Sequence, residues 1–133
     1  MTKKYAITGG AGFIGSNLAQ ALADGNEVVV VDDLSAGKRE NLAGLDVELV
    51  EGSILDLDLL RGAFEGCASV FHQAAIASVQ RSVEDPISTS RVGVEGTLNV
   101  LVAARDAGAE RVVFASSAAV YGDSPHLPKR EDI

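Results

Sequence analysis

Short apolar segments alternate with amphipathic segments along the chain, a pattern typical of an α/β sheet whose strands are connected by crossover helices. Strands are predicted over 5–8, 28–31, 47–50, 69–72 and 111–115. The segment Val28–Val31 is continuously apolar, as expected of a strand covered on both faces. Right-handed crossovers then predict one doubly wound parallel sheet of about five strands in the order 3-2-1-4-5. A ligand is expected between the ends of the first and fourth strands, where the winding direction reverses.

Helices are predicted over 13–24, 57–64 and 86–107, and the tail 122–133 reads as loop. The first helix ends before Gly25 and the third before Gly108, at positions where helix ends favour a residue that tolerates positive φ. Asp85 and Pro86 form a typical helix start, because the carboxylate accepts from free amides and proline suits the first turn.

Composition describes an ordinary globular protein with one domain, residues 1–133, since 47% of the residues are hydrophobic and 23% are charged. The net charge of −8 argues against nucleic acid as a partner. No apolar run is long enough for a membrane span or a secretory signal, so a cytoplasmic protein is expected. Cys67 is the single cysteine, and together with two distant histidines it offers no metal-site spacing.

The segment Gly10–Gly15 reads G-A-G-F-I-G and matches the spacing G-x-G-x-x-G. This spacing is weak evidence alone, but here it follows a strand, opens a helix and precedes Asp32, which lies 20 positions beyond Gly12. Glycines allow a diphosphate to approach the free amides of the helix start, and Asp32 can accept from ribose hydroxyls. We therefore predict a dinucleotide site that favours NAD over NADP. Two alternatives stay open: a tight turn without a ligand, and a phosphate site made by Lys38 and Arg39.

Several motifs in the right order closely resemble the extended short-chain dehydrogenase/reductase family, and within it the UDP-sugar 4-epimerases. They are Thr8–Gly15, Asp32, His72–Ala75 and Ser116–Gly122. The resemblance implies a Rossmann-type fold and a tightly held NAD. It also implies a UDP-hexose substrate, oxidised at C4 by hydride transfer to NAD and reduced again on the opposite face.

The resemblance also implies roles for single residues. The diphosphate would lie on Gly9, Gly12, Phe13 and Ile14, the adenosine ribose on Asp32, Asp33, Ser35 and Gly37, the adenine on Ser53 and Ile54, and the middle of the cofactor on Gln73, Ala74, Ala75 and Ala77. Ser117 matches the active-site serine, which binds the sugar oxygen as it becomes a carbonyl. Ser78 matches a serine near the substrate in the branch that accepts N-acetylated sugars, and a helix-capping role is the alternative.

Three positions depart from the family pattern. Ser53 stands where an acidic residue is frequent, Ala77 where many members have a lysine, and Gly93 where an asparagine is usual. A glycine inside the predicted third helix lowers its stability, so we expect close packing or a bend there. Ser53 predicts a weaker contact to the adenine amino group.

The family's catalytic Tyr-x-x-x-Lys pair is absent, because Tyr5 is followed at that spacing by Gly9 and Tyr121 by Pro125. We expect the chain to be the N-terminal part of an epimerase and to be inactive alone. The alternatives are a dinucleotide-binding module without chemistry and a sister dehydratase, decarboxylase or reductase. Ala118 and Ala119, which cannot transfer protons, disfavour the dehydratase and the decarboxylase. The strand 111–115 would leave an uncovered hydrophobic sheet edge, which predicts self-association, as a homo-oligomer or as aggregation.

Overall fold

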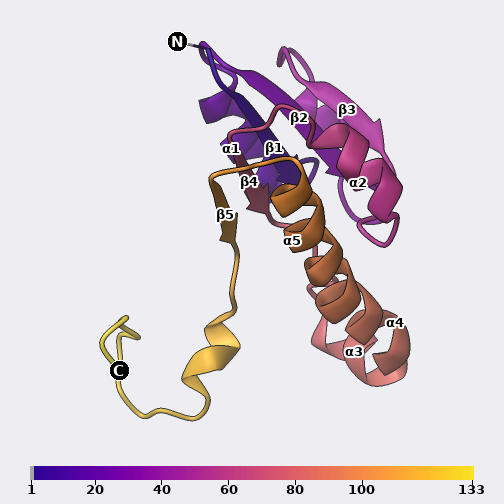
Figure 1. The fold of residues 1–133 in the computed structure, drawn as a ribbon. Coiled ribbons are helices and arrows are strands. Elements are labelled where there is room, and N and C mark those ends of the chain that lie inside the picture. The colour runs from indigo at the N-terminus through magenta and orange to yellow at the C-terminus, as the bar shows by residue number, and fades with distance from the viewer. Residues whose placement is uncertain (1) are drawn as a thin grey trace.

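All five predicted strands are present in the computed structural model, which describes residues 2–133 and is shown in Figure 1. The strands are β1 (Lys4–Thr8), β2 (Glu27–Asp32), β3 (Glu48–Glu51), β4 (Ser69–His72) and β5 (Arg111–Phe114). They are all parallel and lie in the order β3-β2-β1-β4-β5, which confirms the predicted topology. The first crossovers extend the sheet to one side of β1 and the later ones to the other.

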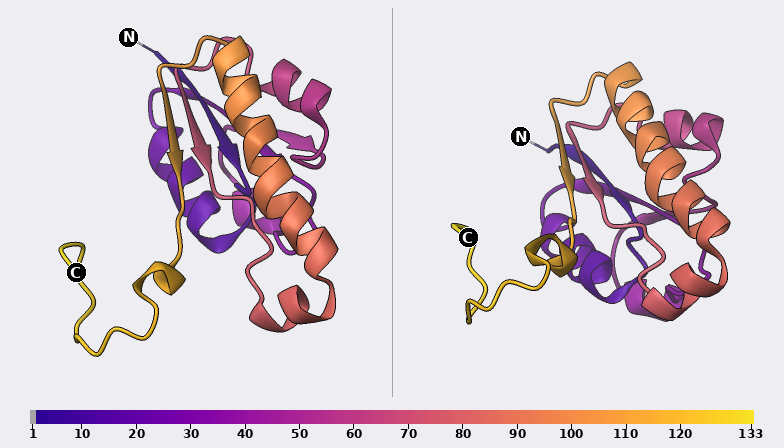
Figure 2. Two further views of the ribbon diagram at one scale, coloured as in Figure 1. Left: turned by 60° about the horizontal axis from the view of Figure 1, so that its bottom comes forward. Right: turned by 90° about the horizontal axis from the view of Figure 1, so that it is seen from below.

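The helical elements are α1 (Phe13–Leu22), η1 (Arg39–Leu42), α2 (Leu57–Ala63), α3 (Val79–Glu84), α4 (Pro86–Ser90), η2 (Arg91–Gly96), α5 (Thr97–Asp106) and η3 (Ala118–Tyr121). Figure 2 shows α1 on one face of the sheet and α2 with α5 on the other. Gly25 and Gly108 both have positive φ and follow α1 and α5, as predicted.

Alternating side chains of β2 bury both faces of the sheet, which explains its continuous apolar run. Val29 and Val31 pack in the core formed with α2 and α5, whereas Val28 and Val30 pack in the core formed with α1 and η1. All four valines are at most 4% exposed. The strand is therefore covered on both sides up to its carboxyl end at Asp32.

The third predicted helix differs from a regular α-helix in its middle. It begins as expected, with Pro86 in the first turn and Asp85 Oδ1 accepting from Ser88 N at 3.2 Å. Residues 91–96 then form the π-helical segment η2 before α5 continues. Gly93 lies in this segment, and a Cβ there would meet nothing within 4 Å. The glycine that packs closely is Gly96, where a Cβ would come within 2.4 Å of Ile54 Cδ1.

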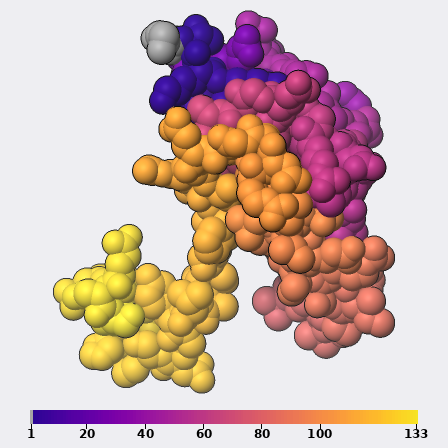
Figure 3. Space-filling view, in the orientation of Figure 1, coloured from indigo at the N-terminus to yellow at the C-terminus, as the bar shows by residue number. Residues whose placement is uncertain are grey.

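The carboxyl ends of β1 and β4 lie side by side, because Thr8 pairs with His72 in the sheet register. The predicted switch point is thus at the centre of the sheet. Residues after β5 leave the sheet and project away from the body of the molecule (Figure 3). Their only regular element among the described residues is the short helix η3.

Candidate functional site

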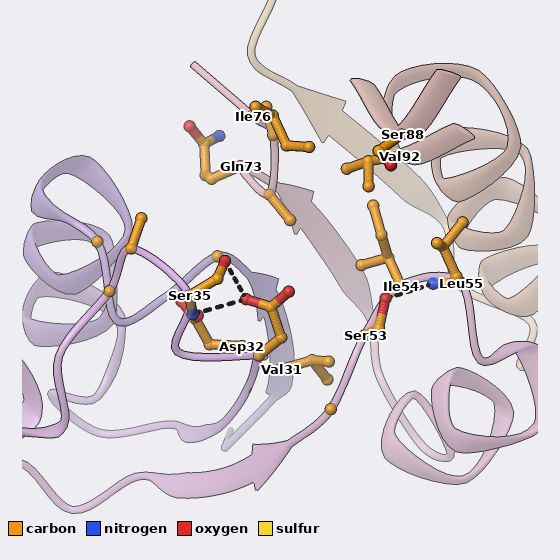
Figure 4. A pocket seen from close by; sticks show the side chains of 18 of the residues that line it. Val31, Asp32, Ser35, Ser53, Ile54, Leu55, Gln73, Ile76, Ser88 and Val92 are labelled. Carbon is orange, nitrogen blue, oxygen red and sulfur yellow. Dashed lines mark hydrogen bonds between the residues drawn. The ribbon is translucent and has the colours of Figure 1, made fainter. Parts of the chain in front are cut away.

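A cavity of about 300 Å³ lies at the switch point, across the carboxyl ends of β1 to β4. Its walls come from the glycine turn after β1, the loops after β2 and β3, the segment after β4, and the helices α3, α4 and η2 (Figure 4). Most of the predicted cofactor residues lie in this lining: Gly9, Gly12, Asp32, Asp33, Ser35, Gly37, Ser53, Ile54, Gln73, Ala74 and Ala75.

Two glycines of the turn are required by the fold itself. Gly9 has φ +69°, and a Cβ there would come within 2.7 Å of Ala74 N. A Cβ on Gly15 would come within 2.2 Å of Gly9 O. Both contacts are with backbone atoms, which cannot move aside as a flexible side chain can. These glycines let β1, β4 and α1 approach one another closely.

Gly12 is different, because nothing in the protein requires a glycine there. Its φ of −80° and ψ of −178° suit any residue, and the nearest atom to an added Cβ would be Gly9 O at an ordinary 3.4 Å. Gly12 lines the cavity and is the N-cap of α1, with no side chain capping the helix and no acidic residue in its first turn. The start of α1 therefore faces the cavity without a capping side chain or a carboxylate in its first turn, an arrangement that favours an anion.

Phe13 and Ile14 lie outside the cavity lining. Their side chains are 85% and 62% exposed and, with Asn17 and Leu18, border a separate shallow hollow on α1. Only their backbone amides, in the first turn of α1, belong to the helix start that faces the cavity.

Asp32 is almost completely buried and both of its carboxylate oxygens are engaged. Oδ2 accepts from Ala11 N at 3.0 Å, and Oδ1 accepts from Leu34 N at 2.8 Å. The side chain thus ties the glycine turn to the loop that follows β2. Each carboxylate oxygen can accept a second hydrogen bond, so capacity for a ligand hydroxyl remains on the cavity side.

The loops after β2 and β3 face each other across the cavity, with Asp32 and Ser35 opposite Ser53 and Ile54 (Figure 4). Asp33 Oδ1 accepts from both the amide and the hydroxyl of Ser35, at 3.0 and 2.7 Å. Ser53 Oγ accepts from Leu55 N at 3.1 Å. Ile54 is buried against Gly96, so this wall is apolar and well packed.

His72 has a structural role beneath the cavity. Thr8 Oγ1 accepts from Gln73 N and Ala74 N, both at 3.2 Å, so its own proton is donated to His72 Nδ1 at 2.6 Å. The opposite ring nitrogen, Nε2, then carries the hydrogen that is donated to Thr97 Oγ1 at 3.0 Å. Burial lowers the pKa of His72 below its ordinary value, and the ring is neutral. A general base would need a free nitrogen, which His72 does not have.

The two predicted substrate serines lie outside the cavity lining, and both cap helices. Ser78 Oγ accepts from Arg81 N at 3.2 Å at the start of α3. Ser117 Oγ accepts from Ala119 N at 3.0 Å at the start of η3. Ala77, like Ser78, is exposed and is not part of the lining.

Sequence reasoning missed the wall contributed by α3, α4 and η2, where Arg81, Ser88 and Val92 line the cavity. The helix α3 has only six residues, too few for a periodic pattern to reveal it. Its one signal was Ser78 in a capping position.

Outside the cavity, burial raises the pKa of the Cys67 thiol to about 11, which leaves it a core residue without nucleophilic character. Within residues 2–133 no group of three or more His, Cys, Asp or Glu side chains is arranged to hold a metal ion. None of the helices in the described part of the chain combines the length and hydropathy needed to cross a membrane.

Comparison with known proteins agrees with this geometry. The sequence profile described as the NAD dependent epimerase/dehydratase family matches residues 5–133. UDP-glucose 4-epimerase of Mycolicibacterium smegmatis is 46% identical over 135 aligned residues, which cover 96% of this chain and 43% of that protein.

Solved structures extend the similarity to the fold. UDP-glucose 4-epimerase of Brucella ovis, in complex with NAD, is 40% identical with a TM-score of 0.89, covering 98% of this chain and 41% of that one. UDP-N-acetylglucosamine 4-epimerase of Methanobrevibacter ruminantium, in complex with UDP-N-acetylmuramic acid, is 37% identical with a TM-score of 0.89. The match covers 98% of this chain and 43% of that one. The chain spans less than half the length of each of these three proteins.

Proposed function

The chain belongs to the NAD dependent epimerase/dehydratase family, and on this premise we propose that it forms the NAD-binding part of a UDP-sugar 4-epimerase. The observation that carries the proposal is Gly12. Packing does not require a glycine there, yet Gly12 lines the cavity at the uncapped start of α1. A glycine at such a place is explained by a ligand that needs the room of a missing side chain, and the helix start favours a phosphate.

The residues around the cavity fit an adenine dinucleotide. A volume of about 300 Å³ is at the lower end of the range for small-molecule sites and suits the adenosine diphosphate portion. The diphosphate would lie over the amides at the start of α1, the ribose beside Asp32 and Ser35, and the adenine against Ile54. Gln73 and the alanines that follow would border the remainder of the cofactor.

Asp32 favours NAD over NADP, because its carboxylate would repel a phosphate on the ribose. The alternative of a phosphate site at Lys38 and Arg39 loses support, since the Arg39 guanidinium is paired with Glu51.

When bound, NAD would supply the hydride acceptor and donor for the sugar carbon. The part played by this chain's own side chains would centre on Ser117, which follows the carboxyl end of β5. Its oxygen already accepts from Ala119 N, so the hydroxyl proton remains to be donated to the sugar oxygen. The neighbouring Ala118 and Ala119 transfer no proton, which favours epimerisation over elimination of water.

We propose that Ser78, at the start of α3, also contacts the sugar. Its hydroxyl accepts from Arg81 N in the cap and is exposed, so its proton is also available. The relatives include enzymes named for UDP-glucose and for UDP-N-acetylglucosamine. We propose a UDP-hexose substrate of one of these two kinds.

Two measurements test the proposal. Calorimetric titration with NAD and with NADP is expected to show NAD binding at least about tenfold tighter, a difference of about 1.4 kcal/mol. Equal affinity, or no binding of either, would contradict the assignment.

An assay with UDP-galactose and NAD distinguishes the alternative of a module that binds without chemistry. We expect no turnover by this chain alone, because neither Tyr5 nor Tyr121 is followed by a lysine at the catalytic spacing. The second protein to assay is a longer polypeptide that contains residues 1–133 and a Tyr-x-x-x-Lys pair. Turnover by that polypeptide would support the epimerase, and NAD binding without turnover would support the module.

A further inference from the structure

The peptide groups on both sides of Ala11 are held from outside the glycine turn. Ala11 N donates to Asp32 Oδ2 at 3.0 Å, and the Ala11 side chain is fully buried. Ala11 O accepts two hydrogen bonds, from Lys38 N at 3.0 Å and from Asn41 Nδ2 at 2.8 Å. Ala11 thus connects the turn to the end of β2 and to the helix η1, of which Lys38 is the N-cap.

Asn41 provides the only side-chain contact to the Ala11 carbonyl among the described residues. It lies in η1, and its neighbour Leu42 is 7% exposed in the core formed with α1. The backbone of Gly37 also approaches Ala11 so closely that a Cβ there would come within 2.8 Å of Ala11 C. Asn41 is an exposed residue, but it is presented from an anchored element and its hydrogen bond to the turn is partly buried.

The Ala11 carbonyl and the Gly12 amide belong to one planar peptide group, so the direction of one fixes the direction of the other. Gly12 N donates to Gly9 O at 3.2 Å, and the next amides, of Phe13 and Ile14, begin α1 at the cavity. Without Asn41 the Ala11 carbonyl would be held by Lys38 N alone, so the direction of this peptide group, and of the amides that follow it, would be less firmly fixed.

We propose that Asn41 is a positioning residue for the bound diphosphate, acting through the Ala11–Gly12 peptide group. Asn41 itself does not line the cavity. The inference rests on the proposed NAD site, and it assigns to Asn41 the orientation of the amides that bind the anion.

The test compares two nucleotides that differ in the diphosphate. Adenosine reaches only the Asp32 and Ile54 end of the site, whereas ADP adds the diphosphate. Asn41→Leu, which keeps the approximate shape but removes the donor, is expected to weaken ADP roughly five- to tenfold by calorimetry. Adenosine affinity is expected to stay within about twofold, because its contacts do not involve the Ala11–Gly12 peptide group.

Asn26 offers a matched control at the opposite end of α1. Its Nδ2 donates to Leu22 O at 3.0 Å, a bond of the same kind, from a side-chain amide to a backbone carbonyl, but at the last residue of α1 and away from the glycine turn. Asn26→Leu is expected to lower stability without changing either affinity. The inference is overturned if Asn41→Leu binds ADP as the unaltered chain does, or if it loses adenosine and ADP equally, since the latter describes a general loss of fold.

If Asn41→Leu does not fold, Asn41→Asp replaces it and Asn26→Asp becomes its control. These variants keep the side-chain shape, and about 1 M salt shortens the Debye length to about 3 Å, so the added charge is screened. A selective loss of ADP by Asn41→Asp supports the inference, and an unchanged ADP affinity overturns it. Failure of the unaltered chain to bind ADP at all is a separate result that refutes the proposed NAD site.

Discussion

The clearest test of the cavity is Gly12→Ala, because Gly12 is free of packing constraints. An alanine methyl there has Gly9 O as its nearest neighbour, at 3.4 Å, and the backbone is already extended. Alanine is a poorer N-cap than glycine by up to about 1 kcal/mol. Alanine also lowers the conformational entropy of the unfolded chain, which raises the free energy of unfolding by about 0.4–1 kcal/mol. The free energy of unfolding should therefore change by less than about 1 kcal/mol.

Ligand binding should respond very differently. The added methyl would stand at the place where the diphosphate meets the start of α1, and overpacking of a closely fitted contact costs about 1–3 kcal/mol. The affinity for NAD is expected to fall roughly 5- to 150-fold. Calorimetry gives this affinity, and urea denaturation gives the free energy of unfolding.

Gly15→Ala is the matched control, since Gly15 belongs to the same turn. Its Cβ would lie 2.2 Å from Gly9 O and 2.7 Å from Gly10 Cα. These overlaps with backbone should destabilise the fold by more than about 3 kcal/mol. The reasoning is refuted if Gly12→Ala binds NAD as tightly as the unaltered chain, or if its stability falls as far as that of Gly15→Ala.

Two further predictions concern buried polar groups. His72 is neutral when folded and its pKa is lowered by burial, so the unfolded chain takes up the proton first. The free energy of unfolding should therefore fall as the pH drops below about 6.5, by at most about 1.4 kcal/mol per pH unit. Urea denaturation between about pH 7.5 and pH 5 measures this change. His72→Asn should lose this dependence, and an unchanged slope would contradict the assignment. Asp32→Asn would turn an amide NH2 toward either Ala11 N or Leu34 N, and it should destabilise the fold by about 1–3 kcal/mol. In the control Asp33→Asn, Oδ1 can still accept both bonds from Ser35, so a similar loss of stability there would refute the argument.

The local pattern of apolar residues and glycines was sufficient to predict the sheet and the glycine turn. The apolar run of β2 could be buried only between two layers of helices, and a strand, a glycine turn and a helix in succession place the turn at the carboxyl end of the strand. Because parallel strands require crossovers of fixed hand, the order of the strands also followed from their sequence positions. Asp85 and Pro86 marked a helix start correctly, since capping depends on neighbouring residues alone.

The third helix shows where local pattern stopped being sufficient. The pattern predicts one helix over 86–107 with close packing or a bend at Gly93. In the structure a Cβ on Gly93 would meet nothing within 4 Å, and the close contact is between Gly96, at the end of the π-helical segment η2, and Ile54. Periodicity also could not reveal that α3 and α4 bring Arg81 and Ser88 to the cavity, because these short helices are positioned by the turns that precede them.

The amino-acid sequence by itself determined the five strands and their order in the sheet, the helices α1 and α2, and the end at which a ligand would lie, because these follow from periodicity, chirality and the special geometry of glycine. Only the tertiary structure decided which glycine is free for a ligand, that Asp32 is already engaged by two amides, and that Asn41 holds the turn. Such assignments depend on distances between atoms far apart in sequence, and those distances are set by packing of the whole fold.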